Sequence, residues 1–366
     1  MTKFNKGRRQ VMLAGLGATA GATLAAPAIA QSNPSLTWRM PTTFGRNLTA
    51  LYGSAELFTR VVNEMTEGHF TIQWFGPGEL VPPLGVADAV AEGTVEMGQT
   101  AAFYNVGQNP IWAIASGLVF GMNVRGHAAW LVNGGGSEIM QEFFDEQGVH
   151  ALFTGNTGAQ SAGWFRQEIN SMDDFQGLRM RIAGLAGQVF AEAGGSPQQI
   201  APGEIYTALE RGTIDGTKFT SPIDDEQLGF ARVAPYYYWP GWNDGGVAVH
   251  NFVNLDLWND LPAHYRAILT AAAAQAAEFM QTKYDAENPA ALRRVLDAGA
   301  QIKFLPADVI NALSEASDTV YGRLADADPR FAEIYDHYTR YREDLYYWWR
   351  VSELPYDTMM VRKLFS

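Results

Sequence analysis

One segment of the chain nearly repeats a second segment, and this repeat limits the possible folds. PGELVPPLGVADAVAEGTVEMG, residues 77–98, resembles PGEIYTALERGTIDG, residues 202–216. Each copy has the pattern of a loop, a helix, a glycine that ends the helix, and a turn into a strand. Short apolar strands alternate with amphipathic helices around both copies. The sequence therefore predicts an α/β protein with two similar lobes and a cleft between them, although helix–glycine–strand units also recur in other α/β proteins.

The first elements can be read from the apolar periodicity. We expect a strand in SLTWRM, a second strand over 70–74, and helices over 51–65, over 83–91 and after Pro262. The expected division is lobe 1 from 31–155 plus about 245–275, lobe 2 from 156–244 plus about 276–328, and a C-terminal helix and tail over 329–366.

The amino terminus has the pattern of an export signal that is later cleaved. Residues 1–30 contain four basic residues and no acidic one, followed by a weakly apolar Ala/Gly run and the small-x-small sequence AIA before Gln31. The apolar run is too short for a transmembrane helix. The arginine pair in GRRQVML favours twin-arginine export over general secretion, and either route predicts a periplasmic protein.

Charge and cysteine content exclude several classes of function. The whole chain has a net charge of −13, and without the four basic residues of the signal it reaches −17. Nucleic acids and anionic membrane surfaces are therefore not expected partners. The chain contains no cysteine, which excludes disulfides, thiol catalysis and cysteine-bound metals.

Arg181 is the leading candidate for a ligand-binding residue. In SMDDFQGLRMRI, Ser171 suits a helix N-cap, Gly177 suits the end of the helical turn, and a short strand follows. Arg181 lies toward the carboxyl end of that strand, where open α/β sheets bind their ligands. A guanidinium group can hold a carboxylate with two parallel hydrogen bonds, so Arg181 predicts an organic-acid site; the alternative is a surface ion pair.

Several motifs together resemble one protein family. They are GELVPP at 78–83, EGTVEMGQTAAFYNVGQNP at 92–110, GNTGAQSAGWFRQEI at 155–169, FQGLRMRI at 175–182, LERGTIDG at 209–216 and YYYWPGWNDGG at 236–246. With these motifs the chain resembles the periplasmic solute-binding proteins of TRAP (tripartite ATP-independent periplasmic) transporters, in the branch that binds 2-oxo and 2-hydroxy acids.

The resemblance implies a two-lobe periplasmic-binding-protein (flytrap) architecture that closes on a small monocarboxylate such as pyruvate or lactate and delivers it to a membrane permease. By resemblance, Arg181 holds the carboxylate, and the Gln160 side chain, the Phe219 main-chain carbonyl and Asp244 hold a metal cation. The family pattern has a glutamate and a tryptophan where this chain has Asp244 and Phe219. Further cleft residues are expected at Tyr104, Asn156 and Trp242, although all three residue types also serve in packing and turns.

A charge count also predicts the cation. If Arg181 and a substrate carboxylate cancel, Asp244 remains as a buried charge without compensation, which is costly. One monovalent cation would make the set neutral, so charge favours sodium, and calcium is the alternative because it also takes hard oxygen ligands. The alternative is that Asp244 is a turn residue in WNDGG.

Two further questions concern function and assembly. The expected activity is solute binding without catalysis; the alternatives are an exported enzyme that acts on a small organic acid, and a binding protein for sensing. Near the C-terminus, an aromatic stripe falls at helical spacing, at Tyr335, Tyr338, Tyr341, Leu345 and Trp348, and Tyr346, Tyr347 and Trp349 broaden it. The stripe predicts either packing on its own lobe or a homodimer through the C-terminal helix.

Overall fold

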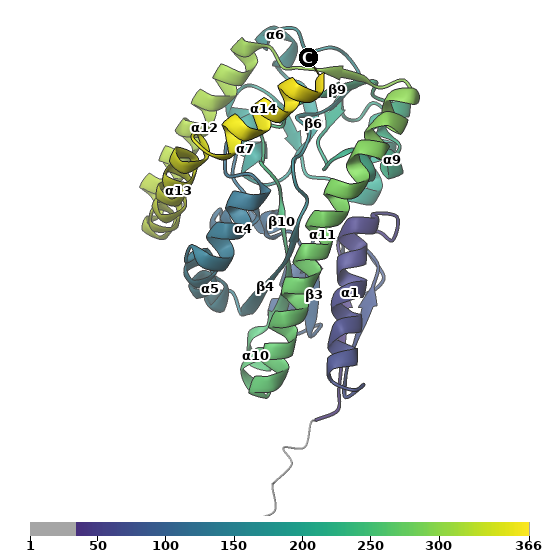
Figure 1. Cartoon of the computed structure of the whole chain (residues 1–366), viewed down its shortest axis with the longest axis vertical. Coiled ribbons are helices and arrows are strands. Elements are labelled where there is room, and N and C mark those ends of the chain that lie inside the picture. Colours follow the sequence, from purple (N-terminus) through teal and green to yellow (C-terminus); the bar gives the residue numbers. More distant parts are fainter. Residues whose placement is uncertain (1–33, 366) are drawn as a thin grey trace, which may run out of the picture. The chain divides into compact units, whose positions relative to one another are not determined.

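The computed structural model describes residues 34–365, so the predicted export signal lies outside the described residues. From Ser35 onward the chain forms one compact unit of mixed α/β structure (Figure 1). The strands are β1 Leu36–Pro41, β2 Phe70–Phe75, β3 Met97–Thr100, β4 Val149–Asn156, β5 Gly163–Phe165, β6 Arg179–Arg181, β7 Ser196–Gln198, β8 Gly216–Thr217, β9 Tyr236–Tyr238, β10 Ala248–Asn254 and β11 Gln301–Lys303.

The helices are α1 Thr49–Met65, α2 Val86–Ala91, α3 Ile111–Ser116, α4 Val124–Asn133, α5 Gly136–Glu146, α6 Met172–Phe175, α7 Leu185–Glu192, α8 Ile205–Glu210, α9 Pro222–Leu228, α10 Leu255–Asp260, α11 Ala263–Asp297, α12 Ala307–Ala327, α13 Pro329–Trp349 and α14 Glu353–Phe365. Short 3₁₀ helices are η1 Ala102–Asn105, η2 Pro202–Glu204 and η3 Phe230–Arg232. The strands expected at SLTWRM and over 70–74 and the helix expected over 51–65 are confirmed as β1, β2 and α1. The helix expected to begin at Pro83 begins instead at Val86.

Within residues 34–365 the strands form three sheets. β1 and β2 pair in parallel, and β10 pairs antiparallel between β3 and β4. A larger mixed sheet has the order β11-β9-β5-β8-β6-β7. The first two sheets use strands from before residue 157 and from 248–254, whereas the larger sheet uses strands from 163–238 and 301–303. This division of the strands between sheets agrees with a two-lobe architecture. The residue boundaries of the lobes given above stay a prediction.

The long helix α11 packs on elements of the first two sheets and reaches α9. Its first half buries Tyr265 and Leu269 in a cluster with Phe58 of α1 and Phe70 of β2. Further along, α11 also contacts β4 and α9, as its path in Figure 1 indicates. Its apolar positions follow helical spacing, as expected for a packed face.

Of the C-terminal helices, α12 and α13 pack on the body of the fold. α12 contacts α6 and α7, and α13 contacts α3, α4 and α5. In the predicted aromatic stripe, Tyr338 is buried, and Tyr335, Tyr341 and Leu345 are partly buried against the core. Trp349, which broadens the stripe, is buried, whereas Trp348 is 57% exposed, so the prediction is wrong for Trp348.

Candidate functional site

The strand that carries Arg181 forms as the sequence predicts. The Ser171 side chain accepts a hydrogen bond from the main-chain N–H of Asp173 and caps α6. Gly177, with φ +68°, ends this turn in the left-handed conformation that glycine adopts easily. β6 then lies between β8 and β7, parallel to both. Arg179 stays at the surface in an ion pair with Asp215, whereas Arg181 is only 2% exposed.

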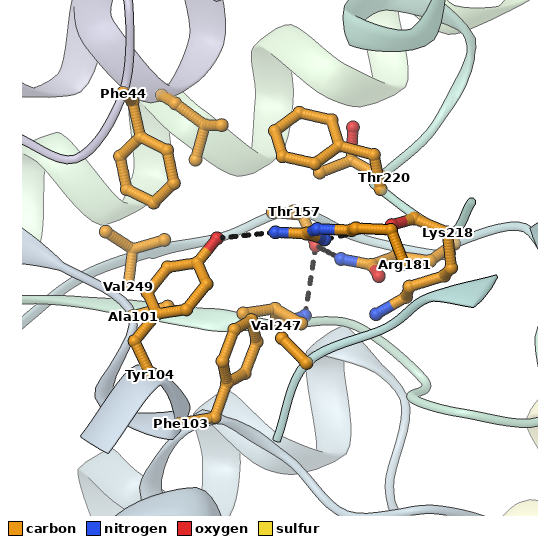
Figure 2. A pocket seen from close by; sticks show the side chains of 14 residues that line it. Phe44, Ala101, Phe103, Tyr104, Thr157, Arg181, Lys218, Thr220, Val247 and Val249 are labelled. Carbon is orange, nitrogen blue, oxygen red and sulfur yellow. Dashed lines mark hydrogen bonds between the residues drawn. The ribbon is translucent and has the colours of Figure 1, made fainter. Parts of the chain in front are cut away.

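The guanidinium group of Arg181 is held by three neighbours. Its Nε donates to the carbonyl of Ile200 at 3.0 Å, and Nη1 donates to the carbonyl of Lys218 at 2.9 Å. Its Nη2 donates to the hydroxyl of Tyr104 at 3.2 Å (Figure 2). Tyr104 lies on η1, in the segment after β3, so this bond joins the two halves of the fold.

Tyr104, Arg181 and Lys218 line a narrow cavity. Arg181 and Lys218 lie on one side of it in Figure 2, and Phe44 and Tyr104 lie on the opposite side. Its polar lining residues are Tyr104, Thr157, Gln160, Arg181, Lys218 and Thr220. The remaining lining is apolar: Phe44, Leu51, Ala101, Phe103, Ala183, Phe219, Val247 and Val249. The structure thus brings together four predicted site residues, Arg181, Tyr104, Gln160 and Phe219.

Gln160 and Phe219 have different surroundings in this cavity. Gln160 Nε2 donates to Thr157 Oγ1, while Gln160 Oε1 is buried and has no hydrogen-bond partner among the described residues. The Phe219 ring lies 5.7 Å from the guanidinium carbon of Arg181, a cation–π distance. The Phe219 side chain therefore forms part of the cavity wall beside Arg181, independently of the metal-binding role predicted for its main-chain carbonyl.

Asp244 is paired with a residue that the sequence analysis did not single out. The Lys218 ammonium donates to Asp244 Oδ2 in a buried ion pair, in which the side chains are only 5% and 7% exposed. The premise that Asp244 lacks a compensating charge is therefore wrong, because the chain supplies its own cation. Burial lowers the pKa of Lys218 and raises the pKa of Asp244, and the attraction between the two opposes both shifts.

The sequence analysis did not predict Lys218, because the repeated motif ends at Gly216, two residues before it. One signal was available in the sequence: Lys218 directly follows the end of a strand. β8 pairs in parallel with β6, with Arg181 opposite Thr217, so Arg181 and Lys218 reach the same edge of the sheet. That edge, at the carboxyl ends of parallel strands, is where ligands bind.

Asn156 and Trp242 do not line this cavity. Asn156 Oδ1 accepts from the main-chain N–H of Gly158 at 3.0 Å, which stabilises the turn after β4. The Trp242 carbonyl accepts from Phe120 N at 3.0 Å, and its side chain lines a different depression beside Arg342. Their roles as ligand contacts stay predictions, and the geometry fits structural roles better.

Two buried acids lie behind Thr220. Asp224 accepts hydrogen bonds from Thr220 and Tyr284, and Asp225 accepts from Trp164 and Tyr237. Burial raises the pKa of Asp224 to about 6 and that of Asp225 to about 7. Neither acid lines the cavity, so they act as supports of its wall.

The predicted metal ligands fit a metal ion only in part. The unpartnered Gln160 Oε1 would suit a hard cation. The carboxylate of Asp244, however, is already paired with Lys218. While Lys218 holds this carboxylate, Asp244 does not complete a set of ligands for a metal ion.

Sequence comparisons match most of the chain. Residues 43–328 match the family described as "Bacterial extracellular solute-binding protein, family 7". The chain is 39% identical to a monocarboxylate 2-oxoacid-binding periplasmic protein of Nostoc sp. (strain PCC 7120), over 96% of this chain and 98% of that protein.

Solved structures are similar as well. A TRAP transporter solute-binding protein from Bordetella bronchiseptica, a mixed-occupancy dimer with copurified calcium and picolinate, is 40% identical with a TM-score of 0.89, covering 90% of this chain and 98% of that one. A TRAP periplasmic solute-binding protein from Pseudoalteromonas atlantica, with bound sodium and pyruvate, is 34% identical with a TM-score of 0.85, covering 88% and 98%. The expected sodium or calcium ion is thus present in structures of relatives. None of the helices described between residues 34 and 365 has the length and apolar character needed to cross a bilayer.

Proposed function

The chain belongs to family 7 of the bacterial extracellular solute-binding proteins, and we propose that, as a TRAP solute receptor, it binds a small 2-oxo or 2-hydroxy monocarboxylate. This family consists of receptors and not of enzymes, so the exported-enzyme alternative is set aside. Relatives that are described as binding 2-oxoacids or as holding pyruvate support this substrate class.

The proposal rests mainly on the free hydrogen-bond donors of the Arg181 guanidinium group. Three of its N–H groups have partners within residues 34–365, which leaves one N–H on each of Nη1 and Nη2. Two such donors suit the two oxygens of a carboxylate. Because the residues that hold Arg181 are two main-chain carbonyls and one hydroxyl, its positive charge is not cancelled by a direct ion pair.

The lining also selects by charge and size. Arg181, Lys218 and Asp244 together carry one net positive charge, which a single carboxylate neutralises. A second carboxylate would lie among the apolar and aromatic side chains of the lining without a cation, which is costly. The site therefore favours a short monocarboxylate over a dicarboxylate.

Calorimetric titration of the mature protein tests this proposal. We expect pyruvate and lactate to bind, acetate to bind more weakly because it lacks the 2-substituent, and succinate to show little binding. Ligand recovered unchanged after long incubation would agree with a receptor. Tighter binding of succinate than of pyruvate would contradict the proposal.

We further propose a periplasmic location and delivery to a TRAP permease. The export pattern in residues 1–30 supports the location, and the family supports the permease. Co-purification with TRAP membrane subunits would support transport, whereas co-purification with a signalling protein instead would favour the sensing alternative.

We also propose a homodimer through the C-terminal helix. No residue of α14 is buried, and it exposes an apolar set together with the end of α13. This exposed set is Tyr347, Trp348, Val351, Leu354, Tyr356, Met359, Val361, Leu364 and Phe365. An exposed apolar surface of this kind is typical of an interface, and a Bordetella relative is described as a dimer. Light scattering should show a dimer for the full mature chain and a monomer for a chain that ends at Ser352. A monomeric full mature chain would contradict the proposal.

A further inference from the structure

The buried ion pair between Lys218 and Asp244 gives this site a cation of its own. Lys218 directly follows β8 and Asp244 lies in the loop between β9 and β10, so residues distant in sequence meet here. Lys218 lines the cavity, and Asp244 lies behind it. The two side chains are among the least exposed charged groups of the described chain, beside Arg181.

We infer that the Lys218 ammonium is the resident cation of this site, in the place beside Asp244 that a metal ion would take, so that the organic acid binds without a metal. This inference rests on the proposed function. It differs from what the solved relatives hold, since those contain sodium or calcium with their ligands.

The charges of the site support this assignment. Arg181 and Lys218 contribute two positive charges, and Asp244 and one bound carboxylate contribute two negative ones. The set is therefore neutral without a metal. An added sodium ion would leave one surplus positive charge in a site with little exposure to water, close to two other cations.

A metal ion would also have to displace Lys218. If the metal took the Asp244 carboxylate, the ammonium group would remain buried without its partner, which is strongly unfavourable. Lys218 is tethered to the sheet edge through its main chain, where its N–H donates to the Arg181 carbonyl at 2.9 Å. A tethered cation loses less freedom on binding Asp244 than a free ion does.

The ammonium group also has the chemistry to contact the acid. It has three N–H donors, of which Asp244 Oδ2 accepts one. The other two suit the 2-oxo oxygen and a carboxylate oxygen of the ligand, as a metal ion would. The unpartnered Gln160 Oε1 suits the hydroxyl of a 2-hydroxy acid.

Titration of the unmodified mature protein with pyruvate tests the inference directly. One buffer contains sodium and calcium, and the other contains a chelator and tetramethylammonium as the only added cation. We expect dissociation constants that agree within about twofold, and native mass spectrometry should show pyruvate bound without a metal. A tenfold or larger loss of affinity in the metal-free buffer would overturn the inference.

Lys218→Met should create a requirement for metal. The variant removes the ammonium group and keeps an unbranched side chain, so we expect weak pyruvate binding in the metal-free buffer and recovery with sodium or calcium. Equal pyruvate affinity of parent and variant in the metal-free buffer would overturn the inference. Lys303→Met is the matched control, because Lys303 pairs with Glu168 away from the cavity; it should bind as the parent does in both buffers.

A double variant covers the case in which Lys218→Met does not fold. Lys218→Met combined with Asp244→Asn removes both buried charges, so we expect a folded protein that binds pyruvate more weakly than the parent in both buffers. Parent-like affinity of this double variant would overturn the inference. If the parent binds no monocarboxylate in either buffer, the proposed function itself fails; binding only with metal overturns this inference alone.

Discussion

Arg181 is positioned by groups that do not neutralise it. Two main-chain carbonyls and the Tyr104 hydroxyl fix the plane of its guanidinium group, and Asp244, an acid behind the cavity, is bound by Lys218. A lysine at this position keeps the charge but loses the planar fork of donors.

Arg181→Lys should therefore lose affinity for pyruvate by on the order of a hundredfold while the protein stays folded. Calorimetric titration measures the affinity, and thermal unfolding checks the fold. Arg179→Lys is the matched control, since Arg179 lies two residues away and pairs at the surface with Asp215. Unchanged affinity of Arg181→Lys for pyruvate would reduce Arg181 to a structural residue.

Asp224 gives a prediction about pH. Its pKa is raised to about 6 by burial, so the folded state holds a proton that the unfolded state releases above about pH 4. The stability from this group is therefore full below pH 4 and is lost as the pH rises through 6. Asp224→Asn removes this pH dependence. Its amide oxygen can still accept hydrogen bonds from Thr220 and Tyr284, and its amide nitrogen replaces Asp224 Oδ1, which has no hydrogen-bond partner among the described residues.

We expect the variant to gain stability relative to the parent as the pH rises from 4 to 8, by about 1.4 kcal/mol for each unit of pKa difference. Urea unfolding at several pH values measures this difference. Asp215→Asn should show the opposite trend, because the hydrogen bond from Arg179 lowers the pKa of Asp215. A pH-independent difference between Asp224→Asn and the parent would mean that Asp224 is ionised throughout.

The role of a single residue could be predicted where the neighbouring sequence determines both its backbone conformation and the chemical group that it presents. Arg181 was found because an N-cap, a glycine stop and a strand end all lie within the same twelve residues. The partnership of Lys218 with Asp244 joins residues 26 positions apart through the pairing of strands, and no local pattern contains that pairing. Asn156 illustrates the reverse case, since its motif suggested a ligand contact and its side chain completes a turn.

At the scale of elements, α12 and α13 are fastened to one loop by tyrosine hydroxyls. Val119 N donates to Tyr321 Oη of α12 at 2.8 Å, and Met122 N donates to Tyr338 Oη of α13 at 2.8 Å. Both tyrosines are nearly or fully buried. The 118–122 loop also bonds to the Trp242 carbonyl near Asp244, so these helices support the wall behind the site.

Tyr338→Phe should destabilise the protein by about 1–3 kcal/mol, because it leaves the buried N–H of Met122 without a partner. The midpoint of urea unfolding measures this loss. Tyr341→Phe is the control at a half-buried position of the same helix, outside the proposed dimer surface, and should change stability by less than about 0.5 kcal/mol. Equal midpoints for Tyr338→Phe and the parent would show that the loop N–H finds another acceptor.

Element positions were predicted better than helix faces. The apolar periodicity placed β1, α1 and β2 well, because each buries one regular face. For α13 the expected stripe included both Trp348 and Trp349, and helical spacing from Tyr338 through Leu345 leads to position 349, where the buried tryptophan lies. Several adjacent aromatic residues, from Tyr346 to Trp349, hid the correct register in the sequence.

At the scale of the whole molecule, the site is built from both lobes. Tyr104, in the segment after β3, contacts Arg181 of the larger sheet, and its carbonyl accepts from Gln199 Nε2 at 3.1 Å. These two hydrogen bonds join opposite sides of the cavity. We therefore expect the lobes to separate when a ligand enters and to close again around it.

Ligand should therefore shift the population from open to closed, because only the closed form lets Tyr104 and Arg181 act on the same acid. We expect the radius of gyration from small-angle X-ray scattering to fall when saturating pyruvate is added to the mature protein. Because ligand shifts the equilibrium only through its preference for the closed form, Arg181→Lys at the same pyruvate concentration should keep the radius of the ligand-free parent. If the parent has the same radius with and without pyruvate that calorimetry shows to be bound, the two lobes form one rigid body, and entry to the cavity must then depend on smaller movements of the side chains around Tyr104.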